Sequence, residues 1–418
     1  MKNLFVYADF EWLNNSELIG TLTYESIRGT DSYAFEFNRE WLKKHKAIFL
    51  SADIQAYSGR QFTEIGKDIF GCFADALPDR WGRTLINRRE QIEAQEEKRS
   101  VKKLSSFDYL CGIDDASRMG ALRFKQTPES EFINSSSSLQ IPPITNIKEL
   151  INACHEIEIS EEKNILPQKK WIHQLIQPGT SLGGARPKAN VIDEFNHLNI
   201  AKFPSRNDDY DVALWEHWAH CMAKQVGINV AQTRVITTEQ KYHTLLSRRF
   251  DRTNDNRRIH FASAMTLLGL NDGANATTNN GYLDIVDFII QHCCNVEQNL
   301  QELYRRVAFN ICIGNSDDHF RNHGFLLTPK GWTLSPAYDM NPTLNNYQSL
   351  LISANSNEAN LELLFDACEE YMLNKQKGKE IIDQVTSSLK NWQEVAIKLQ
   401  IPKSSIDMFS SRINEKIY

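Results

Sequence analysis

The sequence predicts an α+β protein with two lobes, a mixed α/β lobe first and a mainly helical lobe last. The first observation is length, because 418 residues exceed the usual size of one domain. The second is a series of strand-like segments near the start, Leu4–Ala8, Leu18–Thr23 and Tyr33–Phe37, separated by turn residues. The third is mostly helical patterning from about Ser263 onwards.

The first 125 residues are expected to form a small α/β unit. A helical stretch lies around Ile69–Asn87, with an interruption at Pro78. Gly120–Phe124 is expected to be a closing strand. Residues 126–146 contain four consecutive serines and a Pro-Pro pair, which is typical of a surface linker.

The middle of the chain is expected to complete the first lobe. Helical patterning occurs at Ile147–Ile157 and Gln168–Ile176, and strands and one further helix follow: Ala189–Ile192, Leu198–Phe203, Asp211–Val226 (helix), Val230–Thr237 and His243–Phe250. The sequence thus predicts residues 147–252 as the core of the first lobe and residues 253–418 as the helical lobe.

Composition favours a cytoplasmic protein. The formal charge of −6 and the pI near 6.0 argue against a chain built mainly to coat nucleic acid. The start, MKNLFVYADFEW, does not resemble a signal peptide, and no apolar run approaches the roughly 20 residues of a membrane span. The eight cysteines are scattered without a CxxC pair, which suits reduced thiols.

Residues 314–342, GNSDDHFRNHGFLLTPKGWTLSPAYDMNP, form the most informative segment. They follow an apolar helix, Leu303–Ile313, which Gly314 is expected to end. Within the segment Asp317 stands five positions before Asn322. A predicted hairpin then pairs residues 324–327 with residues 332–334, and Asp339 follows.

Phosphoryl transfer needs these residue types in this order. Asp317 would accept the proton of the attacking hydroxyl. Asn322 and Asp339 would hold Mg²⁺, which prefers oxygen ligands. The same acid, amide, hairpin and second acid occur in protein kinases, so the segment predicts a two-lobed, protein kinase-like fold that uses ATP. His319 could orient a backbone carbonyl or a phosphate oxygen. A D-x4-N pair alone would suit a turn equally well, since loops favour both residues.

The segment SLGGARPK, residues 181–188, could cover the phosphates of ATP. Glycine lets backbone N–H groups approach phosphate oxygens, so Gly183, Gly184 and Ala185, with Lys188, are ATP-binding candidates. Two adjacent glycines are also common in plain turns, and the segment matches neither a Walker A motif nor GxGxxG.

The order of further residues supports an ATP site. Lys202 ends a strand, and Glu216 lies fourteen residues later on the predicted helix; in kinases such a pair aims the lysine at the phosphates. Arg248 and Phe250 would lie on the strand against adenine, where the Phe250 ring either stacks or packs in the core.

Several motifs then show a resemblance to a known family. SLGGARPK, NIAKFP, SRRFDR (247–252), GNSDDHFRN, SPAYDMNP, LPDRWGR (77–83) and GALRF (120–124) together resemble the HipA-type serine/threonine kinases, the toxins of bacterial type II toxin–antitoxin systems. The resemblance covers nearly the whole chain and assigns the first 125 residues to the family's N-terminal subdomain.

The resemblance implies partners and regulation. It gives Asp317 the role of base, Asn322 and Asp339 that of Mg²⁺ ligands, and Lys202 contact with the ATP phosphates. Ser181 matches the serine that such kinases autophosphorylate, and about −1.5 to −2 added charges would repel ATP. It also implies a protein substrate of translation, such as an aminoacyl-tRNA synthetase. A HipB-like helix-turn-helix antitoxin is the implied partner, with nucleic acid contacted only through it.

Two positions and two rival functions stay open. Arg248 stands where an acidic residue is expected in the family, and Asp318 either shares metal binding or caps the turn. A small-molecule phosphotransferase of the aminoglycoside type uses the same D-x4-N logic, although the first 125 residues and Ser181 favour a protein kinase. The second rival is a pseudokinase that acts as a DNA-bound corepressor or scaffold.

Overall fold

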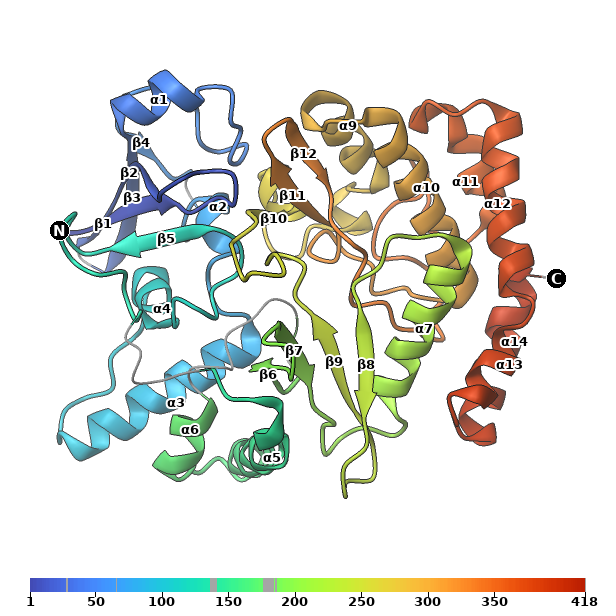
Figure 1. The fold of residues 1–418 in the computed structure, drawn as a ribbon, viewed down its shortest axis with the longest axis horizontal. Coiled ribbons are helices and arrows are strands. Elements are labelled where there is room, and N and C mark those ends of the chain that lie inside the picture. Colours follow the sequence, from blue (N-terminus) through green and yellow to red (C-terminus); the bar gives the residue numbers. More distant parts are fainter. Residues whose placement is uncertain (28, 65, 136–140, 176–183, 185, 418) are drawn as a thin grey trace. The chain divides into compact units, whose positions relative to one another are not determined.

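A computed structural model describes residues 1–27, 29–64, 66–135, 141–175, 184 and 186–417 (Figure 1). The chain divides into two compact units. The first comprises Met1–Asn207 and Asp251–Ala262, and the second comprises Asp208–Phe250 and Ser263–Tyr418.

The first unit contains an antiparallel five-stranded sheet with the strand order β4-β3-β2-β1-β5. Its strands are β1 (Lys2–Ala8), β2 (Glu17–Ile27), β3 (Thr30–Phe37), β4 (Gln61–Phe62) and β5 (Leu122–Lys125). Alternate residues of β1, Leu4, Val6 and Ala8, are buried, as expected for a sheet with one covered face. The three opening strands and the closing strand are therefore confirmed.

Helices and one hairpin complete the first unit: α1 (Arg39–His45), α2 (Gly71–Ala74), α3 (Arg80–Glu96), α4 (Ser106–Gly112), α5 (Ile147–Glu162), α6 (Lys169–Leu175), β6 (Lys188–Ile192) and β7 (Leu198–Lys202). The predicted break at Pro78 is confirmed, since α2 ends before it and α3 begins after it. Asp79 caps α3, because its Oδ1 accepts a hydrogen bond from Gly82 N at 2.7 Å.

The compact units are divided at Asn207 and Ala262, and the boundaries predicted at residues 125 and 252 stay predictions. The hairpin β6–β7 lies in the first unit, where Lys188 forms a buried ion pair at 2.8 Å with Asp79, the residue that caps α3. Residues 251–262 also return to the first unit, where Asp251 Oδ2 accepts a hydrogen bond from Gly120 N at 2.8 Å. Both contacts join residues more than a hundred positions apart, so local patterning does not reveal them.

The second unit is mainly helical. Its elements are α7 (Val212–Val226), β8 (Thr233–Ile236), β9 (Thr244–Arg248), β10 (Phe261–Ser263, at the boundary), α8 (Ala264–Leu267), α9 (Tyr282–His292), α10 (Val296–Ile313), β11 (Gly324–Thr328), β12 (Gly331–Leu334), α11 (Leu361–Asp366), α12 (Lys375–Leu389), α13 (Trp392–Lys398) and α14 (Lys403–Ile417). The strands β8 and β9 pair antiparallel, and β11 and β12 form the predicted hairpin.

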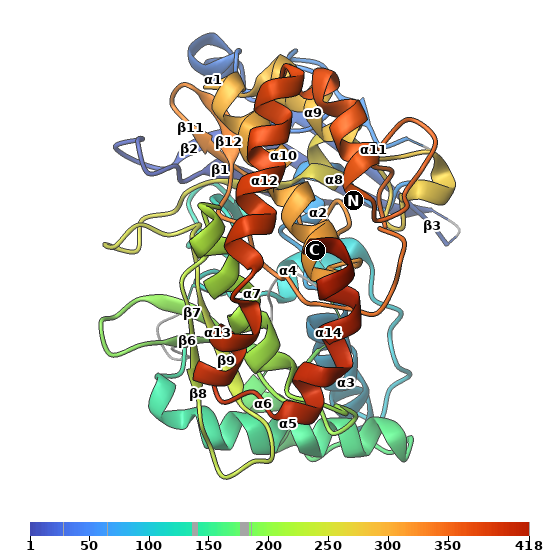
Figure 2. The same ribbon diagram turned by 90° about the vertical axis from the view of Figure 1, so that its right-hand side faces the viewer.

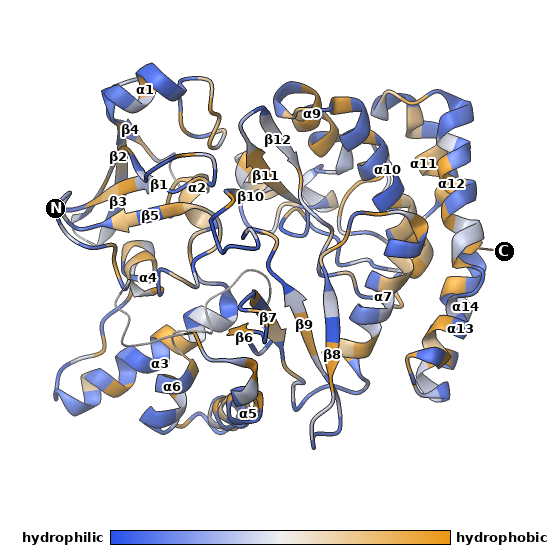
Figure 3. Ribbon diagram, in the orientation of Figure 1, coloured by the Kyte–Doolittle hydropathy of each residue, from blue (hydrophilic) through white to orange (hydrophobic). Residues whose placement is uncertain are grey.

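Helix α10 lies at the centre of the second unit. It packs against α9, α12 and α14 (Figure 2). Its residues from Leu303 to Ile313 are all buried except Arg305. Helices α9 and α10 carry both hydrophobic and hydrophilic residues (Figure 3), as expected for helices with one buried face. Helix α7 is fixed by a tryptophan cluster, in which Trp218 Nε1 donates to Trp392 O at 3.1 Å and Trp215 Nε1 donates to Ser405 Oγ at 2.7 Å.

The helical prediction for the end of the chain is wrong for residues 341–360. This stretch is irregular and is held by isolated bridges, including Tyr347 to Glu358 and Gly281 to Leu351. Its many asparagines and serines compete for backbone hydrogen bonds and so favour turns over helix.

None of the described helices is both long enough and apolar enough to cross a membrane. All eight cysteines lie among the described residues, and all are free thiols, four of them fully buried.

We expect Gly314→Ala to destabilise the protein by about 3 kcal/mol. Gly314 has a φ of +74°, and an added Cβ would lie 2.8 Å from Thr343 O, so conformational strain and a backbone clash both act. Gly273→Ala is the matched control: its φ is +89°, but nothing lies within 4 Å of the new Cβ, and we expect a loss of about 1 kcal/mol. Equal losses for the two variants in urea unfolding would contradict the close approach.

Candidate active site

The loop that carries Asp317 begins where α10 ends. Gly314 adopts a left-handed conformation and ends the helix, as predicted. The next residue is held back onto the helix, since Asn315 N donates to Asn310 O at 2.9 Å. Asp317 therefore projects from a loop whose start is fixed by a helix with a buried end.

The loop is tied to the segment that carries Asp339. Thr343 N donates to Gly314 O at 2.8 Å, and the hydroxyls of Thr343 and Ser316 lie 2.6 Å apart. On the other side, Tyr338 OH donates to Arg321 O at 2.5 Å. These contacts flank both acids, so the two segments stay together at the level of Asp317 and Asp339.

Nearby charges act on the carboxyl group of Asp317. Partial burial raises the pKa of the Asp317 carboxyl, and the negative charges of Asp339 and Asp318 raise it further, whereas His319 lowers it. Two carboxylates that repel each other in this way form a site that a cation would stabilise.

Asn322 completes the group. Its side-chain Nδ2 donates to Asp317 O at 2.9 Å, and its backbone N donates to His319 O at 2.8 Å. Because Nδ2 is held by the loop, Oδ1 is the atom left to act as a ligand, and it accepts no hydrogen bond from the described residues. The amide oxygen is thus available to a cation, and the role of Asn322 as a magnesium ligand stays a prediction.

Asp339 has an unusual backbone conformation. Its φ of +57° is left-handed, which few residues other than glycine and asparagine adopt readily. The preceding chain is fixed, because Ala337 N donates to Asn229 O at 2.8 Å and Ala337 O accepts from Ala231 N at 3.0 Å. Such a conformation persists when its surroundings enforce it, and here it aims a predicted metal ligand.

His319 lies close enough to Asp317 to lower the pKa of that carboxyl. Its ring is half-buried, and its Nδ1 has no hydrogen-bond partner within the part of the chain that the structure describes. A polar atom in this state suits a bound oxygen acceptor, which agrees with the predicted contact to a phosphate or carbonyl oxygen.

Asp318 is a buried structural anion, so neither role left open for it is right. Its Oδ2 accepts hydrogen bonds from Tyr282 OH and Asn310 Nδ2, both at 2.7 Å, and its Oδ1 lies 3.0 Å from His323 Nε2. Burial alone would raise the pKa of this carboxyl, but His323 and these donors outweigh it and lower the pKa. Both oxygens are occupied by side chains, and among the described residues none of its partners is a backbone N–H.

Sequence reasoning missed these supporting residues. Tyr282, Asn310 and His323 are buried, and each lies on a different element from the others, α9, α10 and the loop end. A signal existed for Asn310, which interrupts the apolar run VAFNICI on a helix that is otherwise buried. A buried amide there required a polar partner.

The predicted nucleotide residues fall in both units. Lys202 ends β7 in the first unit, whereas Glu216 lies on α7 in the second unit and is only 2% exposed. Their pairing stays a prediction. Lys188 is 1% exposed and is paired with Asp79, and Gly184 has a φ of +79°.

Two further candidates, Arg248 and Phe250, lie at and just after the end of β9. The ring of Phe250 contacts that of Tyr338 with centroids 5.4 Å apart, so this half-buried ring packs beside Asp339. Arg248 pairs its backbone N with Gln232 O at 2.8 Å. Ser181, Gly183 and Ala185 lie outside the described residues.

The residues present fit a magnesium ion. Among the described residues no group of three or more His, Cys, Asp or Glu side chains could hold a metal ion. An Asn322 amide oxygen with the Asp339 carboxylate, next to the repelling Asp317, is instead an oxygen-only set of the kind that Mg²⁺ accepts, with substrate oxygens and water completing its shell.

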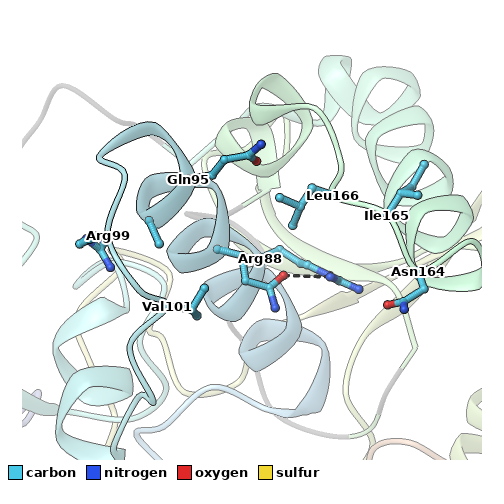
Figure 4. Close-up of a pocket in the computed structure, with 9 residues that line it drawn as sticks. Arg88, Gln95, Arg99, Val101, Asn164, Ile165 and Leu166 are labelled. Carbon is cyan, nitrogen blue, oxygen red and sulfur yellow. Dashed lines mark hydrogen bonds between the residues drawn. The ribbon is translucent and has the colours of Figure 1, made fainter.

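A separate pocket of about 440 Å³ lies in the first unit between α3 and the chain after α5 (Figure 4). Arg88 in this pocket donates to Gln91 Oε1 at 2.9 Å and pairs with Glu161. Arg99 pairs with Glu90 and Glu97. Since both guanidinium groups have carboxylate partners, the pocket is not an anion site.

Comparison with known families decides the relationship. The HipA-like C-terminal domain family matches residues 180–392, and the HipA N-terminal domain family matches residues 12–125. The chain belongs to the HipA family. The resemblance drawn from the seven motifs is therefore confirmed, and both HipA domains are present in the expected order.

Individual relatives are distant. A Shewanella oneidensis protein, the serine/threonine-protein kinase toxin HipA, is 23% identical over 351 residues, which cover 77% of this chain and 72% of that protein. A Haemophilus influenzae protein, named as a candidate kinase, is 26% identical over 180 residues. This match covers 39% of the present chain and about half (52%) of the Haemophilus protein.

A solved structure shares the fold. The Shewanella oneidensis HipA, in a complex with HipB and operator DNA, matches 99% of this HipA-family chain with a TM-score of 0.69 and 19% identity, and 96% of that chain is covered. The α+β, two-lobed kinase-like fold class predicted from the sequence is thereby confirmed.

We expect Asp318→Asn to lower the free energy of unfolding by about 3 kcal/mol at pH 7, because Tyr282 and Asn310 lose a buried carboxylate as their hydrogen-bond acceptor. The pKa of Asp318 is lowered in the folded state. Its stabilisation is therefore full above the ordinary value of 3.8 and is lost as the pH falls through the lower folded pKa.

Urea unfolding at pH 7 and at pH 3 checks this, and the difference between wild type and variant should shrink at the lower pH. Asp272→Asn is the control. Asp272 is 78% exposed and pairs with Arg321 at 3.1 Å, so we expect a change within about 0.5 kcal/mol. A variant Asp318→Asn as stable as wild type at pH 7 would show that the buried anion is dispensable.

Proposed function

We propose that this HipA-family protein is an ATP-dependent serine/threonine protein kinase. The observation that carries the proposal is the convergence of Asp317 and Asp339 beside the oriented amide of Asn322. Small-molecule phosphotransferases share this logic, but the HipA N-terminal domain over residues 12–125 favours a protein kinase. The presence of every polar catalytic position argues against a pseudokinase.

Each residue has a role in the proposed reaction. Asp317 accepts the proton of the attacking serine or threonine hydroxyl, and its raised pKa makes it a better base than an ordinary aspartate. Asn322 and Asp339 hold magnesium through oxygen atoms, and His319 orients a phosphate or carbonyl oxygen. Bound Mg·ATP supplies the phosphoryl group and the cationic charge that offsets its oxygens.

The proposal also assigns the nucleotide contacts. Lys202, oriented by Glu216, contacts the phosphates, and the backbone of Gly183, Gly184 and Ala185 covers them. Phe250 and Arg248 lie toward the adenine. Ser181 is the proposed autophosphorylation site, whose added charge would repel ATP and inactivate the enzyme.

The proposed setting is a bacterial toxin–antitoxin system. The Shewanella relative is named a toxin, and the similar solved structure contains HipB and operator DNA. We propose a HipB-like antitoxin as the partner of this chain, with DNA contacted through it. The proposed substrate is a protein of translation, such as an aminoacyl-tRNA synthetase.

We expect Asp317→Asn to reduce phosphate transfer from labelled ATP by about 10²–10⁴-fold, since it removes a general base. Asp339→Asn should raise the magnesium concentration that is needed for activity. The heat stability of Asp317→Asn serves as the folding control, and it should match or exceed that of wild type because repulsion with Asp339 is relieved. Equal transfer rates for wild type and Asp317→Asn would refute the assignment of the base.

We expect mass spectrometry to find one phosphate on Ser181 after incubation of the protein with Mg·ATP. Asp317→Asn, purified in the same way, should stay unmodified because the transfer is its own. Phosphate on Ser181 in that variant would indicate a different kinase, and no phosphate in wild type after long incubation would contradict autophosphorylation.

A further inference from the structure

The LPDRWGR motif lies in the N-terminal domain, where no catalytic role has been given to it. Two residues of this motif contact Lys188, one at its side chain and one at its backbone. Asp79 Oδ2 lies 2.8 Å from Lys188 Nζ, and Trp81 Nε1 donates to Lys188 O at 3.1 Å. The side chains of Asp79 and Lys188 are 4% and 1% exposed.

Asp79 is itself fixed. Its second oxygen, Oδ1, accepts the N–H of Gly82 and so caps α3. Each oxygen of this carboxylate thus has a separate task, one toward the helix and one toward Lys188. Figure 1 shows the contact region, with the first turn of α3 beside β6.

Lys188 lies at the exit of the glycine-rich segment. It is four residues after Gly184 and is the first residue of β6, and Phe203 N donates to Pro187 O at 2.9 Å. A fixed Lys188 therefore fixes the described end of that segment, from residue 186 into the strand.

The register of the β6–β7 hairpin places Lys188 next to a lysine that is proposed to bind the nucleotide. Lys188 lies directly opposite Lys202, the lysine assigned to the phosphates. Directly opposed residues of antiparallel strands point to the same face, where like charges repel. The Asp79 carboxylate offsets the charge of Lys188 on that face.

We propose that Asp79 and Trp81 are positioning residues for nucleotide binding: they fasten Lys188 in the fold and keep its charge from acting against Lys202. This inference rests on the proposed kinase function. It changes the role predicted for Lys188, from a direct phosphate ligand to the anchor between the N-terminal domain and the glycine-rich segment.

The test is calorimetric titration of the full chain with Mg²⁺ and a non-hydrolysable ATP analogue. Asp79→Asn keeps the cap oxygen for Gly82 and removes the charge, and Lys188→Met removes the ammonium. We expect each variant to weaken analogue binding about tenfold, and the double variant to be no weaker than either single one, since both remove the same contact. Trp81→Phe should show a smaller loss.

The alternative predicts the opposite sign. If Lys188 binds phosphate directly, Asp79→Asn releases a cation and leaves binding unchanged or tighter, while Lys188→Met alone weakens it. That pattern would overturn the proposal. If wild type itself binds no analogue, the kinase function fails rather than the anchor alone.

Glu90→Gln is the matched control for general damage to α3. Glu90 lies on α3, about 16 Å further along the helix axis than Asp79. It pairs with Arg99, which follows the end of the helix. We expect it to lower heat stability without changing analogue binding. If Glu90→Gln weakened analogue binding as much as Asp79→Asn, the effect of Asp79 would come from the stability of α3 and not from its contact with Lys188. That result would overturn the proposal. Trp81→Phe carries the test if Asp79→Asn does not fold.

Discussion

The candidate active site is built on an ionised carboxylate enclosed in the interior of the second unit. Asp318 stands next to Asp317, yet its two oxygens are taken by a tyrosine, an asparagine and a histidine from separate elements. A buried charge with such partners is costly to displace, since moving it would leave the charge or its partners unpaired. The loop therefore has one preferred conformation, and the buried Asp318 fixes the position of the exposed Asp317 beside it.

Two features near the buried Asp318 are energetically unfavourable in themselves. Asp339 keeps a left-handed backbone, and its charge raises the pKa of Asp317. Both features are disfavoured without a ligand, and both are offset by the hydrogen bonds that join residues 314–321 to residues 337–343. In the proposed reaction the site would thus be prepared for magnesium before the ion binds, which is the arrangement that electrostatic catalysis requires.

The sequence predicted most of the fold and named the residues on which the proposed chemistry rests, but it did not predict the support of the site. Strand alternation, the proline break at Pro78 and the glycine after α10 are local signals, and each was confirmed. The partners of Asp318, by contrast, come from positions 282, 310 and 323 and carry no shared local pattern. The same holds for Asp79 with Lys188, whose contact spans 109 positions. Residues 341–360 are irregular, although mostly helix was predicted there, because their asparagines and serines favour turns.

The β6–β7 hairpin has a consequence for how its sequence can vary. Because side chains alternate between faces, one residue gained or lost in the connection at positions 193–197 would turn one of the two opposed lysines to the other face. The side chain of Asp193 also holds this connection, since it accepts hydrogen bonds from Phe195 N and His197 N. Homologues with a longer connection should therefore differ by an even number of residues or carry a bulge that restores the alignment.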